Sequence, residues 1–247
     1  MNNKHIRRSG EQQTESRRPS ICVYCHCEIK TTQDHVVPRC LFDKLPRNMV
    51  TVRACFECNQ KKKEADEYLR DNLVTDIHGS NHPTAKILLE GKVSRSIMRN
   101  QSQFAKDVLP HVQMAPFYSP NGLYLGDVPM APVNDQLVRK ELEYIVRGLT
   151  SKLSDMLIPL DYAFGVNTIP PISMKETLER VKELNYNGPY ELGDEFSCIF
   201  LRSEENHAKT VWILWFYGSV MYVVSSMPSE DLLQRQQPVV QMGPKSN

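Results

Sequence analysis

The sequence predicts an α+β fold, with a small cysteine-rich module first, then helices and a hairpin, and an antiparallel sheet towards the C-terminus. Six of the seven cysteines fall between Cys22 and Cys58. Over residues 135–157, apolar side chains recur every three to four positions, which is the period of a helix that buries one face. Residues 196–225 contain three runs rich in β-branched and aromatic side chains, as strands are.

These features divide the 247 residues into five segments. They are a flexible basic tail (1–20), the cysteine-rich module (21–75), a basic connector of helices and a hairpin (76–130), an α+β accessory domain (131–228) and a flexible tail (229–247). Residues 1–129 hold 19 Lys and Arg against 14 Asp and Glu, whereas residues 130–247 hold 11 against 15. Any polyanion is therefore expected to bind the N-terminal half.

Within the module, the pattern predicts a cysteine knuckle, a hairpin and a helix. Short β-prone runs at residues 35–37 and 48–52 flank a loop that contains Pro46. Residues 55–73 lack Pro and Gly and are rich in Lys, Glu and Ala, so they are expected to form a helix.

In the connector, a short helix is expected from Pro83, with Gly91 just after its end. A second helix is expected over residues 92–109, and its basic side chains could form one face: Lys92, Arg95 and Arg99. A solvated helix surface would look the same. The pair Asn121-Gly122 predicts a hairpin turn.

In the accessory domain, Ser173 and Glu176 form a capping box that predicts the start of a second helix. The three strand-like runs are expected to form an antiparallel meander. Trp212 and Trp215 differ in parity along one strand, so they should point to opposite faces of the sheet.

The cysteine spacing predicts a zinc site rather than disulfides. The N-terminus lacks the apolar core of a signal peptide, and no apolar run approaches the ~20 residues that span a bilayer. A cytoplasmic location follows, where thiols stay reduced. Two Cys-x-x-Cys pairs can close a Zn–S4 tetrahedron that leaves no open position, so this zinc would be structural: Cys22, Cys25, Cys55 and Cys58. The surplus residues Cys27 and Cys40 could compete as ligands or stay free, and His26 lies beside Cys27.

Three polar residues lie inside or next to this clamp and suit a second kind of metal site. Asp34 and Asn59 offer oxygen ligands of the type that Mg²⁺ or Mn²⁺ prefers. A neutral His35 beside them could take a proton from water. A divalent ion there could hold a scissile phosphate and stabilise a leaving oxygen.

The stretch from Ile21 to Val74 resembles the HNH (ββα-metal) endonuclease family, in its variant with a four-cysteine zinc clamp. The motif Cys-x-x-Cys … Asp-His-x-x-Pro … Asn … Cys-x-x-Cys-Asn-x-x-Lys is present residue by residue. The resemblance implies that His35 is the general base and that Asp34 and Asn59 bind one catalytic divalent ion. It also implies that Asn48 braces the hairpin loop and that Lys62 contacts a phosphate. A weaker likeness to bacterial HNH proteins extends over the rest of the chain.

The expected function is metal-dependent hydrolysis of DNA phosphodiester bonds, with RNA not excluded. A monomer would nick, whereas a homodimer could break both strands; a regulatory protein partner is the other open arrangement. Five basic residues are expected to bind the nucleic acid: Arg39, Lys62, Lys63, Arg95 and Arg99. The rival interpretation is a non-catalytic zinc module that binds nucleic acid without a second metal.

Overall fold

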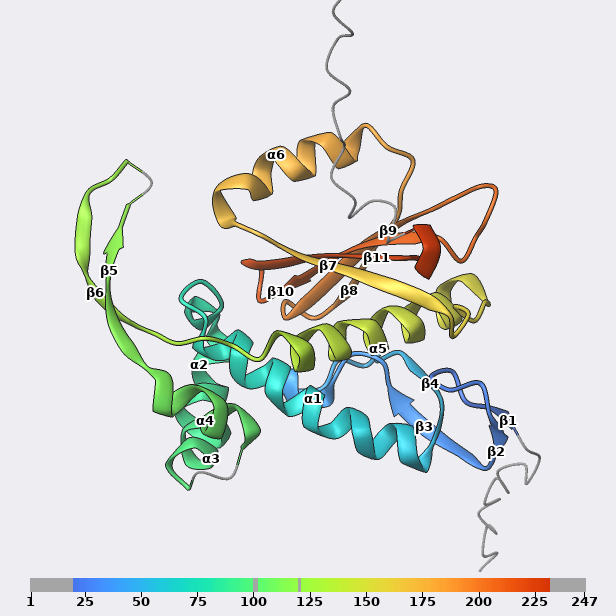
Figure 1. Cartoon of the computed structure of the whole chain (residues 1–247), viewed down its shortest axis with the longest axis horizontal. Coiled ribbons are helices and arrows are strands. Elements are labelled where there is room, and N and C mark those ends of the chain that lie inside the picture. The colour runs from blue at the N-terminus through green and yellow to red at the C-terminus, as the bar shows by residue number, and fades with distance from the viewer. Residues whose placement is uncertain (1–19, 100–101, 120, 232–247) are drawn as a thin grey trace, which may run out of the picture.

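The computed structural model describes residues 20–99, 102–119 and 121–231 of the chain. The two predicted tails therefore lie almost wholly outside the described residues. The mixed α+β architecture is confirmed. Figure 1 shows two long helices, α1 (Phe56–Thr75) and α5 (Asp135–Ser154), with the cysteine-rich module on one side and a C-terminal sheet on the other. Among the described residues, none of the helices combines the length and the apolar composition needed to cross a bilayer.

The N-terminal module contains two small antiparallel sheets followed by a helix. β1 (Ser20–Ile21) pairs with β2 (Glu28–Ile29), and β3 (Thr31–His35) pairs with β4 (Thr51–Cys55). α1 starts at the residue after β4. Two strands and a helix were predicted in this order, but the first strand was placed too late and the second too early: His35 ends β3 instead of starting a strand, and β4 starts at Thr51 rather than at residue 48. Beyond His35, the Val36 N–H still donates to the Val50 carbonyl at 3.0 Å, but Pro38 has no N–H to continue the pairing. Val36 and Val37 are fully buried in the core.

The connector is helical as predicted, but the break between its helices lies later in the chain. α2 (Pro83–Leu88) continues through a π-helical turn (Leu89–Val93) into α3 (Ser94–Met98), so the expected end at Gly91 is wrong. Gly91 has open space where a side chain would be, and its flanking residues Leu88 and Val93 are buried. The expected second helix is instead divided between α3 and α4 (Gln103–Val108). The predicted hairpin is present as β5 (Gln113–Tyr118) and β6 (Tyr124–Met130).

The C-terminal region forms a five-stranded antiparallel sheet in the order β7-β11-β10-β9-β8. The three predicted strands are its centre, and two strands were missed. The bounds are β7 (Tyr162–Ile169), β8 (Asn187–Leu192), β9 (Phe196–Arg202), β10 (Thr210–Phe216) and β11 (Val220–Pro228). α6 (Pro171–Lys182) begins with a proline before the expected cap, so Ser173 lies inside the helix and does not cap it.

The two faces of this sheet pack against different partners. Trp212 is fully buried in the main core, whereas Trp215 packs in a smaller cluster with Val181 of α6, so the predicted opposite orientation is confirmed. The main cluster runs from Cys22 in the module to Val224 in β11, through residues of α1 and α5. The N-terminal module and the C-terminal sheet thus share one hydrophobic core.

Candidate functional site

Four thiols form a compact cluster where the knuckle, the end of β4 and the start of α1 meet. The Sγ atoms of Cys22, Cys25, Cys55 and Cys58 all lie within 4.8 Å of one another. The sulfurs of Cys25 and Cys55 are 3.8 Å apart. A Zn–S bond of about 2.3 Å requires tetrahedral sulfurs about 3.8 Å apart, so the donor set and the spacing both fit a zinc ion. Backbone N–H groups of Cys55 and Cys58 donate to Sγ of Cys22 and Cys55, which favours thiolates.

The remaining described cysteines lie outside this cluster. Cys27 is exposed, and the Cys40 thiol donates to the backbone carbonyl of Asp66 at 3.4 Å. Burial raises the pKa of Cys40 to about 12, so this thiol keeps its proton. His26 has a positive φ of 58°, which turns the knuckle tightly between the first cysteine pair and Cys27.

Asp34 and His35 lie at the end of β3, and Asn59 lies in the first turn of α1, one residue after a cysteine of the cluster. β3 and α1 are in contact. The Asp34 side chain is buried, and its Oδ2 accepts a hydrogen bond of 2.7 Å from the Tyr24 hydroxyl. Burial raises the pKa of Asp34, and the positive charge of Lys62 opposes that rise. Burial, and then the charge of Arg39, lower the pKa of His35, which favours its neutral form.

Lys62 is the centre of a buried charge network instead of a surface group. Its side chain is fully buried, and its ammonium lies 2.6 Å from Asp66 Oδ1 and 3.1 Å from Glu141 Oε1. The same ammonium donates to the backbone carbonyl of His35 at 3.3 Å. Burial alone would lower the pKa of Lys62, but Glu141, Asp66 and Asp34 raise it, so the group stays charged. This placement argues against the expected phosphate contact by Lys62.

Glu141 was not anticipated from the sequence. It is fully buried in α5, and neither carboxylate oxygen accepts a hydrogen bond of good geometry from the residues that the structure describes. Burial raises its pKa, and the Lys62 ammonium opposes that rise. Because the ammonium is only 3.1 Å away, we take the two groups as an ion pair. A glutamate within the apolar rhythm of α5 was the sequence signal that could have revealed it.

C-terminal residues hold the loop that joins β3 to β4. The Tyr217 hydroxyl donates to the backbone carbonyl of Leu41 at 2.8 Å. The side-chain amide of Asn48 donates to the backbone carbonyl of Glu191 in β8 at 2.9 Å. Asn48 therefore ties the loop to the C-terminal sheet, whereas the resemblance implied a brace within the loop itself.

α5 also approaches this loop closely. A side-chain carbon placed on Gly148 would lie 2.7 Å from both methyl groups of Val36, the residue after His35. Real carbon atoms do not approach so closely, so only glycine fits this helix position without movement of Val36. The backbone that follows His35 is therefore fixed from the α5 side.

The four other residues expected to bind nucleic acid are exposed: Arg39, Lys63, Arg95 and Arg99. They come from different elements, since Arg39 lies in a 3-10 turn, Lys63 in α1, and Arg95 and Arg99 at α3. Their exposure permits contact with a polyanion.

Comparison of this chain with protein-family models, with curated proteins and with solved structures found no match.

Proposed function

We propose that this protein is a metal-dependent endonuclease of the HNH (ββα-metal) type that hydrolyses DNA phosphodiester bonds. The observation that carries the proposal is the four-thiol cluster. It links the β3–β4 pair, which bears Asp34 and His35, to the helix start that bears Asn59. A zinc ion held there would keep these three residues on one small rigid unit.

In this proposal His35 takes the proton from the attacking water. Its neutral form, favoured by burial and by Arg39, is the form that can accept a proton. A divalent cation such as Mg²⁺ or Mn²⁺, when bound by Asp34 and Asn59, would supply positive charge to the scissile phosphate and the leaving oxygen. The Tyr24 hydroxyl donates to Oδ2 of Asp34 and orients this carboxylate, which would be one of the two ligands of that cation.

Lys62 acts as a positioning residue in this scheme. Its ammonium holds the backbone carbonyl of His35 and is itself held by Glu141 from α5. Exposed Arg39, four residues after His35, is then the nearest expected phosphate contact along the chain.

The test is cleavage of supercoiled plasmid by the full-length, zinc-loaded protein with Mg²⁺ or Mn²⁺. His35→Ala should lower the nicking rate by about 100-fold or more, which is the usual contribution of a general base. His207→Ala, a change at an exposed histidine of the β9–β10 loop, is the matched control and should cleave like the unmodified protein. Equal nicking by the His35→Ala variant would remove the base assignment, and no nicking by the unmodified protein with either metal would overturn the proposal.

A second candidate is a zinc-containing module that binds nucleic acid without catalysis. The burial of Asp34 and its hydrogen bond from Tyr24 favour this candidate, because together they give the carboxylate a structural role without a metal ion. This candidate predicts DNA binding that is unchanged when Mg²⁺ is omitted and when Asp34 is changed to Asn. A gel-shift titration under both conditions separates the two candidates.

A further inference from the structure

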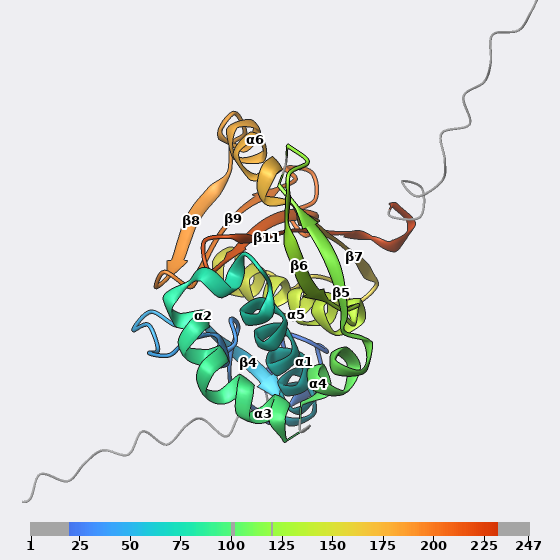
Figure 2. The same cartoon turned by 90° about the vertical axis from the view of Figure 1, so that its left-hand side faces the viewer.

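The β5–β6 hairpin is an apolar arm that projects from the body of the molecule (Figures 1 and 2). It forms a two-stranded sheet of its own, and no other described strand pairs with either edge. Residues 112–131 contain one charged side chain, Asp127. Six large apolar side chains of this arm are more than half exposed: Met114, Tyr118, Leu123, Tyr124, Leu125 and Met130. Exposed apolar surface of this extent on a two-stranded hairpin indicates a binding site for a partner or a ligand.

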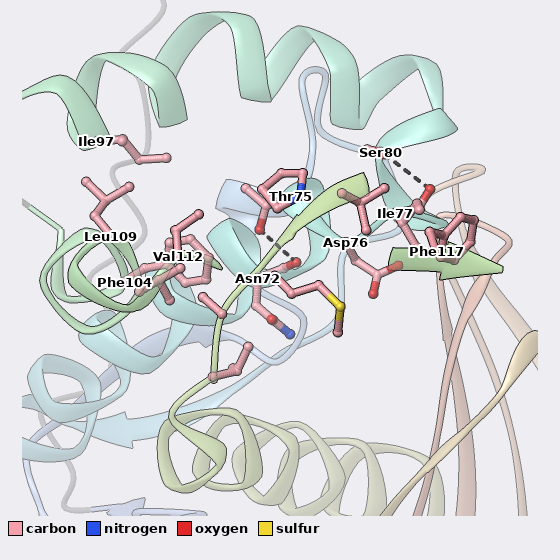
Figure 3. A pocket seen from close by; sticks show the side chains of 16 residues that line it. Asn72, Thr75, Asp76, Ile77, Ser80, Ile97, Phe104, Leu109, Val112 and Phe117 are labelled. Atoms are coloured by element: carbon pink, nitrogen blue, oxygen red, sulfur yellow. Dashed lines mark hydrogen bonds between the residues drawn. The ribbon is translucent and has the colours of Figure 1, made fainter. Parts of the chain in front are cut away.

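A groove of about 590 Å³ lies between this arm and the body (Figure 3). Its walls come from the C-terminal end of α1, from α3 and α4, and from the inner side of the hairpin. Most of the lining is apolar and includes Ile77, Ile97, Phe104, Val112, Phe117 and Val128. An occupant of this groove should therefore present apolar side chains and little charge.

The tip of the hairpin has those properties but cannot enter the groove of its own chain. Gly122 takes a positive φ of 81° in the turn, and the backbone N–H of Ser119 donates to the carbonyl of Leu123 at 2.8 Å. The rings of Tyr118 and Tyr124 pack edge to face, 5.7 Å apart. These contacts hold the tip, Leu123 to Leu125, in the hairpin conformation, so that it does not fold back into the groove of its own chain.

The terminal segments of this chain match the groove less well than the hairpin does. Residues 1–19 carry five Lys and Arg and two Glu, and their large apolar residues are Met1 and Ile6. Residues 232–247 carry eight polar or basic side chains among sixteen residues, including Arg235 and Lys245. A small apolar ligand would fit the volume, but it would leave the exposed tip without a role.

We propose that the groove binds the hairpin tip, Leu123 to Leu125, of a second copy of this chain. Two copies that exchange tips about a two-fold axis bury both tips and both grooves in one closed dimer. The four-thiol cluster lies at the opposite end of α1 from the groove. The inference stands independently of the proposed nuclease activity, because it rests on a different surface.

The test is sedimentation velocity of the full-length protein over a concentration series. The chain of 28.4 kDa should sediment as a species of twice that mass at micromolar concentration. A tip variant that combines Leu123→Glu and Leu125→Glu should raise the dimer Kd by about 100-fold or more, since each charge is placed in an apolar contact twice per dimer. Leu160→Glu, at a similarly exposed leucine between α5 and β7, is the matched control and should leave the Kd unchanged.

A groove variant, Leu109→Lys, allows a decisive experiment in which it is mixed with the tip variant. Leu109 lines the groove and is nearly half exposed, so the substitution should not disturb folding. Alone it should weaken dimerisation as the tip variant does. Mixed with the tip variant, it should form heterodimers. In a heterodimer an unmodified tip meets an unmodified groove, and the Glu-bearing tip meets the Lys-bearing groove. An unmodified chain that stays monomeric up to about 100 µM, a tip variant no weaker than Leu160→Glu, or a mixture without heterodimers would each overturn the proposal.

Discussion

Replacing Lys62 by Met should strongly destabilise the protein, because it leaves a buried carboxylate without its cation. Glu141 is fully buried, and Lys62 Nζ at 3.1 Å is the ion-pair partner that the structure gives it. Removing one member of such a pair costs about 3–5 kcal/mol. The second partner, Asp66, is partly exposed and adds little. For a chain of this size each kcal/mol lowers Tm by about 2–4 °C, so a fall of about 6–20 °C is expected.

Urea unfolding of three variants tests the origin of this loss. Replacing both Lys62 and Glu141 by Met should restore the free energy of unfolding to within about 1 kcal/mol of the original, because no unpaired charge remains. Lys63→Met changes the exposed neighbour on α1 and should cost less than about 0.5 kcal/mol. If Lys62→Met matched Lys63→Met in stability and instead weakened DNA binding, the buried pair would be refuted and the phosphate contact supported.

Three further perturbations probe the surroundings of the candidate site. Gly148→Ala should destabilise the protein in urea unfolding, since overpacking costs about 1–3 kcal/mol and the gain in helix propensity offsets only about 1 kcal/mol of that. Adding Val36→Ala should relieve the clash, and a double variant without that relief would contradict the close contact. Tyr217→Phe should cost about 1–3 kcal/mol in the same assay, because it leaves a buried loop carbonyl without a donor; an unchanged midpoint would refute that contact. Cys55→Ser should release zinc and unfold the N-terminal module, measured by metal analysis and circular dichroism, whereas Cys27→Ser, at an exposed thiol outside the cluster, should keep the metal.

Local sequence patterns predicted the parts of this fold that depend on local chemistry. Cysteine spacing identified the four thiols that come together, and the apolar period identified α5 to within a few residues. The sequence positions of Trp212 and Trp215 predicted that they lie on opposite faces, because successive side chains of a strand alternate between the two faces in any surroundings. The roles of His35, Asp34 and Asn59 stay predictions, since the structure gives their positions and not their chemistry.

The missed features depend on contacts between residues distant in the sequence. β7 and β8 are edge strands of the sheet, and their pairing with β11 and β9 gives no strong local signal. Lys62 was expected to contact a phosphate, and only the approach of Glu141, 79 positions later in the chain, shows it as a buried cation. Gly148 likewise looks like an ordinary helix glycine until Val36 is placed beside it.

The region that follows the cysteine-rich module therefore also holds the backbone of the candidate site in place. Val36, directly after the proposed base, packs on Gly148 of α5, and the His35 carbonyl is held by a lysine whose charge is balanced from α5. The loop that follows is bound by Tyr217 and, through Asn48, by β8. An isolated zinc-bound module would lose all of these contacts and expose the apolar residues of the loop to water. Zinc can fix where β4 meets α1, whereas the C-terminal residues fix the backbone around His35, so the proposed chemistry would depend on both.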